Sequence, residues 1–354
     1  MYRYRPLGTF RLLLAALVVA EHLAANLAPT EAFRAVAAYE VGNVAILASF
    51  CLSGLVVADA AERAYLGRPV AFLANRALRV APPFLAAAAL SILLHLWLSA
   101  AGVTRATREA AVMAEAAFGL PNVLGNLAGF LPLSDRLVGH DFLTIAWAVG
   151  VVVAFYLVVF ACLCLGRLHP RLLAAGLGPV ATLAYAALLL AFALAVLGKL
   201  PATLGFVPYF GFGAALHFAL RGERAGRWIA AASLPLVLWH FLAQPGHHPT
   251  AGFARAVGAQ LALLEALLVA MTALAALSLP RRAARIDRLL GGLAYPLYLC
   301  NTAALLLVAA TFAPADAYAA LAWAAVLSVL IAVASRGLVD APLAPLRDRV
   351  RGGA

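Results

Sequence analysis

The sequence predicts an all-α fold, a polytopic transmembrane helical bundle of about ten spans with both termini in the cytoplasm. Hydrophobic residues make up 65% of the 354 residues and charged residues only 12%, whereas soluble domains are about 45–50% apolar and about 25% charged. The apolar residues fall in long runs, and only helices or closed barrels satisfy their backbone polar groups inside lipid. The basic residues lie in short connectors between these runs.

Windows of about 20 apolar residues place the spans near 7–28, 41–60, 80–101, 143–166, 172–197, 203–220, 228–242, 257–279, 289–311 and 317–339. The first run is too long for the apolar core of a cleaved signal peptide, so we expect it to remain as the first span. The seventh is short, and we expect it to tilt little or to break near Pro235. Pro82 and Pro83 are expected to break or redirect the third helix at the membrane boundary.

The distribution of basic residues predicts the orientation. Of the 26 Lys and Arg residues, twenty fall on connectors that are cytoplasmic if the N-terminus is inside, and six fall on the other side. This asymmetry favours cytoplasmic termini and an even number of spans. The longest connector, about 102–142, is then an external folded loop. We therefore expect a single transmembrane domain over residues 1–354, without a fused soluble domain, in the plasma membrane, which is the inner membrane of a bacterium.

Several partners are not expected from the composition. The net charge of +11 does not gather on one soluble face, so the pattern indicates the lipid bilayer rather than nucleic acid as the partner. The cysteines lie inside apolar runs without a CxxC spacing, which argues against a disulfide framework or a zinc site and favours packing roles; they are Cys51, Cys162, Cys164 and Cys300. No metal site is predicted.

The first span contains the leading candidate for catalysis. Arg11 and His22 are eleven residues apart, close to three helical turns, so both side chains point to the same side of the helix and lie about 16 Å apart along it. Ionisable groups inside a span usually face a cavity or a partner. The alternative interpretation is an arginine at the interface and a histidine hydrogen-bonded in the core. Glu21 points about 100° away from His22, and a catalytic role and an ion pair with another span remain open for it.

A second candidate lies at the cytoplasmic beginning of the third span. Arg76 and Arg79 are three residues apart and share a helix face. Paired guanidinium groups suit phosphate because their forked donors bind it bidentately. The alternative interpretation is that these arginines only anchor the helix at the inner membrane surface.

Six segments, taken in order, resemble the motifs of one known family. They are Arg11-x10-His22; Phe50-Cys-Leu-Ser53-Gly54; Arg76-x-x-Arg79-x-x-Pro82; Trp147 with Phe155-Tyr156; Gly292-Leu-Ala-Tyr295-Pro-Leu-Tyr298-Leu; and Asp340-Ala-Pro342. The chain thus resembles the acyltransferase 3 family of membrane-bound O-acyltransferases, over nearly its whole length from Arg5 to about Arg349. Each segment alone is a weak signal, but six in order make a specific match.

The chain departs from the family pattern at several polar positions. Val152 stands where the family usually has Glu, Asn301 where it has His, Asp340 where it has Glu, and Leu47 where an Asp often occurs. Two explanations remain open: a divergent member with a different acceptor, or a catalytically impaired member. The retained arginines and His22 favour the active, divergent member.

The resemblance implies that the chain transfers an acyl group, acetyl or another short one, from cytoplasmic acyl-CoA to a hydroxyl of a glycan or other small acceptor. It would thus be a transferase of groups other than amino-acyl groups, active for example in polysaccharide O-acetylation. The implied donor-binding residues are Arg11, Arg76 and Arg79, and the implied catalytic residue is His22, as general base or as acyl carrier. Acyl-CoA would be a substrate, with no permanently bound cofactor.

Weaker candidates complete the predicted site. The residues that could line it are Glu21, Ser53, Tyr156, Glu265, Tyr298, Asn301 and Asp340. For Ser53 we favour packing beside Gly54 over a nucleophilic role. Glu265 could replace the missing acid at Val152 or pair with an arginine.

A transporter or flippase of lipid-linked sugars is the main competing function, since composition and span count allow it equally well. The sequence lacks the half-to-half repeat with broken helices that usually indicates a transport site. A non-catalytic binding or scaffold member of the same family is the third possibility. Turnover of an acyl donor would separate these three functions.

Overall fold

The computed structural model describes residues 5–27, 39–102, 115–132, 139–168, 189, 192–193, 205–243, 253–311 and 317–352. These residues form helices and connecting turns, with no strand among them, which confirms the predicted all-α class. The predicted span near 172–197 lies almost entirely outside the described residues.

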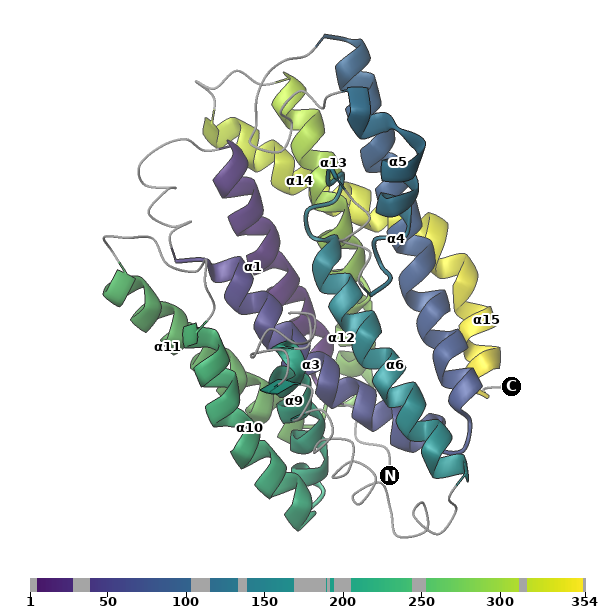
Figure 1. The fold of residues 1–354 in the computed structure, drawn as a ribbon, viewed down its shortest axis with the longest axis vertical. Helices are drawn as coiled ribbons and strands as arrows, with labels where there is room; N and C mark the ends of the chain where they lie inside the picture. Colours follow the sequence, from purple (N-terminus) through teal and green to yellow (C-terminus); the bar gives the residue numbers. More distant parts are fainter. Residues whose placement is uncertain are drawn as a thin grey trace. The chain divides into compact units, whose positions relative to one another are not determined.

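The helices follow one another along the chain as shown in Figure 1. They are α1 (Leu7–Leu27), α3 (Val41–Ala64), α4 (Pro69–Ala100), η1 (Glu115–Phe118), α5 (Leu120–Leu127), α6 (Ala146–Leu168), α9 (Val207–Leu220), α10 (Arg224–Ala243), α11 (Phe253–Ala276), α12 (Arg281–Gly291), α13 (Ala294–Thr311), α14 (Ala317–Ser335), η5 (Arg336–Asp340) and α15 (Ala341–Arg351). Within the described ranges, 8 helices are long and apolar enough to cross a membrane, α12 with α13 and α14 with α15 counting as one each. The chain is therefore a multi-pass membrane protein, while the number of spans and the side of the termini stay predictions.

Two predicted spans differ from the helices that the structure shows. The span expected near 203–220 corresponds to α9, whose 14 residues extend about 21 Å, less than the roughly 30 Å of a bilayer core. The span expected near 228–242 corresponds to α10, which continues through Pro235. Of the two outcomes that we allowed for this helix, a break at the proline is wrong.

Of the two outcomes expected at Pro82 and Pro83, a break in the helix is also wrong. Helix α4 runs without a break over 32 residues from Pro69 to Ala100 and contains both prolines. Prolines remove backbone donors, but membrane helices tolerate them where neighbouring groups satisfy the disturbed carbonyls. The carbonyls that lose their donors are those of Leu78 and Arg79. The Tyr295 hydroxyl from α13 donates to the neighbouring Val80 carbonyl at 3.1 Å.

The chain forms two compact units, each assembled from separate segments. The first comprises Met1–Ile46, Arg79–Gly150 and Ser278–Ala344, and the second comprises Leu47–Leu78, Val151–Leu277 and Pro345–Ala354. The prediction of a single domain stays a prediction.

The core of the first unit is the packing of α1 on α13 and α14, which lie together in Figure 1. The buried residues recur at intervals of three, four or eight positions, so those of each helix share one side of it. They are Ala15, Val19, Leu23 and Leu27 of α1, Leu297, Leu305 and Val308 of α13, and Ala320, Ala324 and Ala332 of α14. Small residues at this spacing let membrane helices approach closely and pack by van der Waals contact. The alanine stripe of α14 thus explains how three helices share one core.

A buried carboxylate holds the beginning of α1. Asp287 of α12 is 3% exposed and accepts hydrogen bonds at 2.7 Å from the backbone N–H groups of Gly8 and Thr9 and from the Thr9 hydroxyl. The first backbone N–H groups of a helix lack partners within the helix and carry partial positive charge, so this carboxylate satisfies them. Gly8 leaves no room for a larger residue, since a Cβ there would lie 2.0 Å from the Asp287 carbonyl oxygen.

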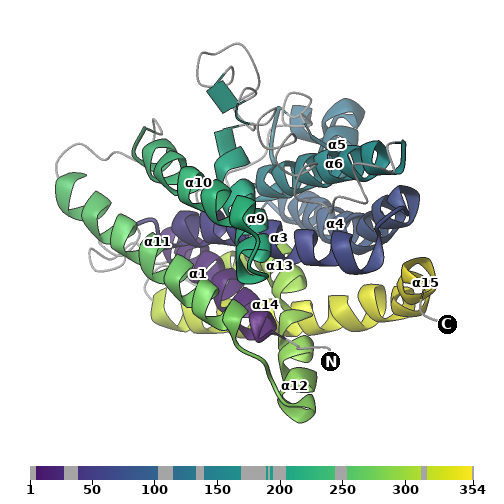
Figure 2. The same cartoon turned by 90° about the horizontal axis from the view of Figure 1, so that it is seen from below.

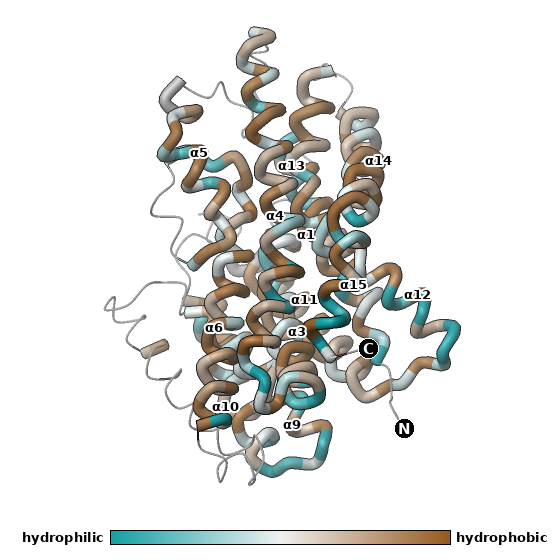
Figure 3. Tube along the Cα trace, turned by 90° about the vertical axis from the view of Figure 1, so that its right-hand side faces the viewer, coloured by the Kyte–Doolittle hydropathy of each residue, from teal (hydrophilic) through white to brown (hydrophobic). Residues whose placement is uncertain are grey.

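In addition to the long apolar helices, the structure contains two helices, α12 and α15, that were not predicted. In Figure 3 both contain hydrophilic turns, whereas α14 is mostly hydrophobic. The exposed arginines of α12 are Arg281, Arg282, Arg285 and Arg288, beside the exposed apolar Ile286 and Leu289. A helix with this composition is typical of one that lies in the membrane interface.

The connector predicted as an external folded loop contains η1 and α5. The side-chain amide of Asn122 donates to the carbonyls of Ala117 and His140, and its oxygen accepts from the backbone N–H groups of Gly139 and His140. The side chain of Asn126 likewise bonds to the backbone of His140 and Phe142. These amides replace backbone pairing, so the described part of this connector is folded.

The second unit is built around a close crossing of α3 and α9. A Cβ at Gly54 would lie 2.2 Å from the Phe210 carbonyl oxygen, and a Cβ at Gly213 would lie 1.7 Å from the Cys51 carbonyl oxygen. Both positions therefore require glycine. The Phe210 ring stacks on Phe50 and on Phe155 beside this crossing. Helix α9 also packs along α10, as Figure 2 shows.

The last turns of the chain bind back to the turn before α4. The Arg68 guanidinium donates to the carbonyls of Val350 and Arg351, and the Asn75 amide donates to the carbonyl of Arg347. The last carbonyls of a helix lack partners within the helix, and a cation there is favourable. These bonds hold the end of α15 against α4.

Candidate active site

Helix α1 places Arg11 and His22 as the sequence suggests. The helix has no break between Leu7 and Leu27, so the two residues lie about 20° apart around it and about 16 Å apart along it. Both side chains are half-buried. One helix thus presents a cation near its beginning and an imidazole about three turns further on.

His22 lies on α1 between two packed faces. On one side, Val18 and Glu21 are close to Gly42 at the start of α3. On the other side, Val19 and Leu23 belong to the core shared with α13 and α14. The histidine is therefore at the edge of the seam between α1 and its neighbours.

Glu21 performs a structural task. Its Oε2 accepts a hydrogen bond of 2.6 Å from the backbone N–H of Gly42, in the first turn of α3. A carboxylate at a helix N-terminus is favourable because of the partial positive charge there. The contact ties α3 to α1, next to His22 in sequence but about 100° from it around the helix.

Helix α13 contributes two tyrosines and an asparagine to the same unit. The Tyr298 hydroxyl donates to the Ile145 carbonyl at 2.8 Å, and the Tyr295 hydroxyl donates to Val80. Asn301 is fully buried, and its amide nitrogen donates to the Tyr298 carbonyl at 2.5 Å. The tyrosines are therefore held by backbone carbonyls in the structure.

The two arginines of α4 lie in different surroundings. Arg76 is 7% exposed, and its guanidinium carbon lies 5.2 Å from the centre of the Phe72 ring and 5.4 Å from the centre of the Tyr156 ring. Such contacts attract a cation to the negative face of the ring. Arg79, in contrast, is exposed. Tyr156 therefore contacts one of the predicted donor-binding residues, which the sequence could not show.

The remaining predicted residues lie apart from these contacts. Ser53 is half-buried beside Gly54, whose contact with Phe210 supports the packing interpretation. Glu265 is exposed on α11, and Asp340 is half-buried at the end of the π-helical turn η5. The structure does not bring Glu265 into the cluster of charged groups described next.

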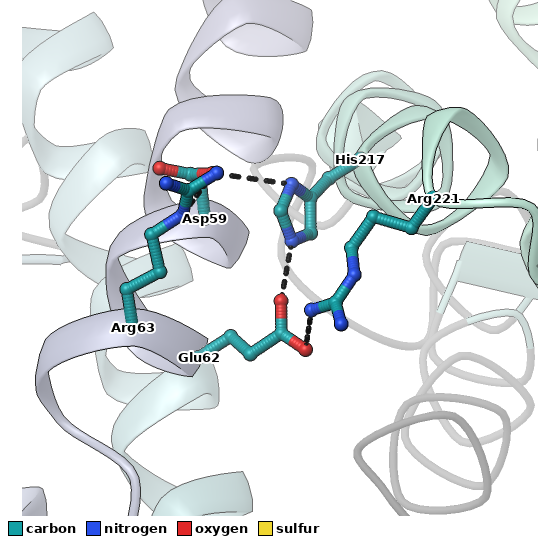
Figure 4. Close-up of polar contacts among 5 residues, drawn as sticks. All are labelled: Asp59, Glu62, Arg63, His217 and Arg221. Atoms are coloured by element: carbon teal, nitrogen blue, oxygen red, sulfur yellow. Dashed lines mark hydrogen bonds and ion pairs between the residues drawn. The ribbon is translucent and has the colours of Figure 1, made fainter. Parts of the chain in front are cut away.

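A buried histidine between two carboxylates was missed by the sequence analysis (Figure 4). His217 of α9 is fully buried, with Nε2 2.8 Å from a Glu62 oxygen and Nδ1 3.5 Å from an Asp59 oxygen. Arg63 pairs with Asp59 at 2.9 Å, and Arg221 pairs with Glu62. The five residues, Asp59, Glu62, Arg63, His217 and Arg221, form what we name the α3–α9 charge cluster. The cluster joins the C-terminal ends of α3 and α9.

The sequence model of the acyltransferase 3 family, described as an acyltransferase domain, matches residues 7–336. The chain belongs to the acyltransferase 3 family. Comparison with curated proteins and with solved structures gives no match. The matched residues include the Arg11–His22 helix, Arg76, Arg79 and Asn301, whereas Asp340 and α15 lie beyond them.

The acyltransferase has its candidate groups in two arrangements. In the first unit, α1 and α13 place His22, the only histidine of α1, near a packed seam with buried polar groups. In the second unit, aromatic rings surround the Arg76 guanidinium, and an imidazole joins two carboxylates. Within the described ranges, no group of three or more His, Cys, Asp or Glu residues could hold a metal ion.

Proposed function

We propose that this acyltransferase moves an acyl group, acetyl or another short one, from cytoplasmic acyl-CoA to a hydroxyl of a glycan or other cell-surface or small acceptor. The observation that carries the proposal is the arrangement of Arg11 and His22 on one side of an unbroken α1. Their separation of about 16 Å is of the same order as the length of the donor's pantetheine arm. A donor whose phosphates meet Arg11 would therefore extend its thioester toward His22.

Arg76 is the second group that supports an anionic donor. Arg76 is buried, and its guanidinium stacks on the Phe72 and Tyr156 rings, which favours a cation at this position. A guanidinium can bind a phosphate group with two parallel hydrogen bonds, so its chemistry suits the phosphates of the donor. Arg79 is exposed on the next turn of the same helix and would add a second cation.

Two chemical routes fit His22, and both give the same products. As general base, the imidazole takes the proton of the acceptor hydroxyl while the oxygen attacks the thioester carbon; the carbon–sulfur bond breaks, and the thiolate takes that proton to leave as coenzyme A. As acyl carrier, the imidazole first attacks the thioester and releases coenzyme A, and the hydroxyl then attacks the acyl-imidazole. Neither route needs a further reactant.

Family membership favours this proposal over a transporter or flippase, whose sites do not require an acyl donor. The catalytically impaired alternative is separated by experiment. Purified protein in lipid vesicles is given acetyl-CoA labelled in the acetyl group together with candidate glycans. The proposal predicts labelled ester on a glycan and stoichiometric free thiol. Absence of thiol release with every acyl-CoA tested would overturn it.

A variant that lacks the guanidinium fork of Arg76 extends the test. Arg76→Lys keeps the charge but loses the planar fork and much of the stacking. The proposal predicts a higher KM for acetyl-CoA with the acceptor KM unchanged. An unchanged donor KM would remove Arg76 from the donor site.

A further inference from the structure

The side-chain amide of Asn301 has one satisfied end and one unsatisfied end. Its nitrogen donates to the Tyr298 carbonyl at 2.5 Å, and only the amide nitrogen can face a carbonyl oxygen, so the orientation of the amide follows. Its oxygen Oδ1 is buried and has no hydrogen-bond partner in the part of the chain that the structure describes. The whole residue is 0% exposed.

Such an oxygen is unusual in a folded protein. A buried acceptor without a donor loses its hydration without compensation, and native structures keep few of them. Within a membrane the loss is harder to offset, because lipid offers no donors. The unsatisfied oxygen therefore indicates a donor group that is not part of the described chain.

The position of Asn301 indicates where that donor lies. On α13, Asn301 follows Leu297 by four residues and precedes Leu305 by four, so the three share one side of the helix. Leu297 and Leu305 belong to the core shared with α1. Asn301 is thus on the side of α13 that packs against the helix of Arg11 and His22.

We propose that Asn301 Oδ1 accepts a hydrogen bond from an amide N–H of the pantetheine arm of acyl-CoA. This inference rests on the proposed function and names a donor-binding residue for it. The arm is a mostly apolar chain with amide N–H groups, and these groups lose their water when the arm enters an apolar seam. The seam between α1 and α13 is lined by Ala, Val and Leu, and Asn301 offers it an acceptor.

The first experiment changes one atom of the donor. Acetyl-CoA is compared with two analogues in which an ester oxygen replaces the N–H of one amide or of the other. The parent protein should use one analogue about three- to tenfold less well in kcat/KM, the scale of one neutral hydrogen bond. Asn301→Leu should use acetyl-CoA and that analogue equally well. Asn301→His retains an acceptor nitrogen and should preserve the discrimination.

The second experiment measures stability and needs no acyl transfer. Asn301→Leu removes an unsatisfied buried acceptor, so its thermal unfolding midpoint without ligand should be at or above that of the parent. Coenzyme A should raise the midpoint of the parent by more than that of the variant, because a ligand that binds only the folded state stabilises it in proportion to its affinity.

Thr302→Val is the matched control. The Thr302 hydroxyl is also buried and without a partner among the described residues, but it lies about 100° around α13 from Asn301. This variant should respond to coenzyme A as the parent does. If coenzyme A stabilises the parent and Asn301→Leu equally, Asn301 does not bind the donor, although the proposed function survives. If coenzyme A stabilises no variant at any concentration, the donor itself is wrong and both proposals fail.

Discussion

Removing the imidazole from the α3–α9 charge cluster should destabilise the protein strongly. His217→Phe keeps a planar ring in the buried position, but Asp59 and Glu62 lose the polar group between them, which lies 3.5 Å and 2.8 Å from their oxygens. Removing one partner from a buried charge pair costs about 3–5 kcal/mol. The carboxylates are 25% and 19% exposed and keep their arginine partners, so we expect the lower end, about 3 kcal/mol.

The assay is thermal unfolding in detergent, followed by the reactivity of the buried thiols of Cys51 and Cys300 as they become exposed. A cost of this size should lower the midpoint by roughly 5–10 °C. Arg63→Ala is the control from the same cluster. Its pair with Asp59 is an exposed i,i+4 contact, worth about 0.3–0.5 kcal/mol, and its midpoint should move by no more than a degree or two.

A double variant tests the reasoning further. In His217→Phe combined with Glu62→Leu, the carboxylate that faced Nε2 is also removed, so part of the lost stability should return. If His217→Phe costs no more than Arg63→Ala, the cluster does not stabilise the crossing of α3 and α9. If the stability changes of the two single substitutions simply add in the double variant, the histidine and the glutamate do not interact.

Three further predictions concern the membrane topology, the donor phosphates and Asn301. Cysteines placed at positions 68, 224 and 285 should resist membrane-impermeant labels added outside intact cells, because the charge distribution predicts that these connectors are cytoplasmic. Labelling at position 68 would reverse the predicted topology. The apparent affinity for acyl-CoA should exceed that for an acyl-pantetheine without phosphates by one to two decades, the scale of a charge-assisted hydrogen bond. The double variant Arg76→Ala with Arg79→Ala should lose that preference. Equal weakening of both donors would assign the arginines to packing. Asn301→His should leave transfer nearly unchanged, and a large gain in rate would show that the chain is a crippled family member.

Most of the long helices could be predicted because the membrane acts on each apolar run by itself. Helices α1, α3, α6 and α14 follow from run length and composition alone. Helices α12 and α15 could not be found in this way, since both are short and rich in arginine. Their positions depend on distant contacts, from Asp287 to the beginning of α1 and from Arg68 to the end of α15.

The site residues likewise fall into those that local sequence predicts and those that depend on distant contacts. The shared side of Arg11 and His22 follows from helical geometry within one span. The pairing of Glu62 with His217 joins residues 155 positions apart, which no local pattern encodes. A signal was present, however: Asp59 and Glu62 lie three apart at the end of one apolar run, and His217 and Arg221 lie four apart at the end of another. Opposite charges at the ends of two spans are candidates for pairing.

In the proposed mechanism, His22 performs the acyl transfer. The most direct measurement compares the parent with His22→Ala, both purified and both shown to unfold at similar temperatures, for thiol release from acetyl-CoA with an acceptor present. The half-buried imidazole fills little of the core, so the variant should fold and should lose roughly two orders of magnitude or more in rate, the scale of a general base. A folded His22→Ala protein that stays within a few-fold of the parent rate would contradict the account.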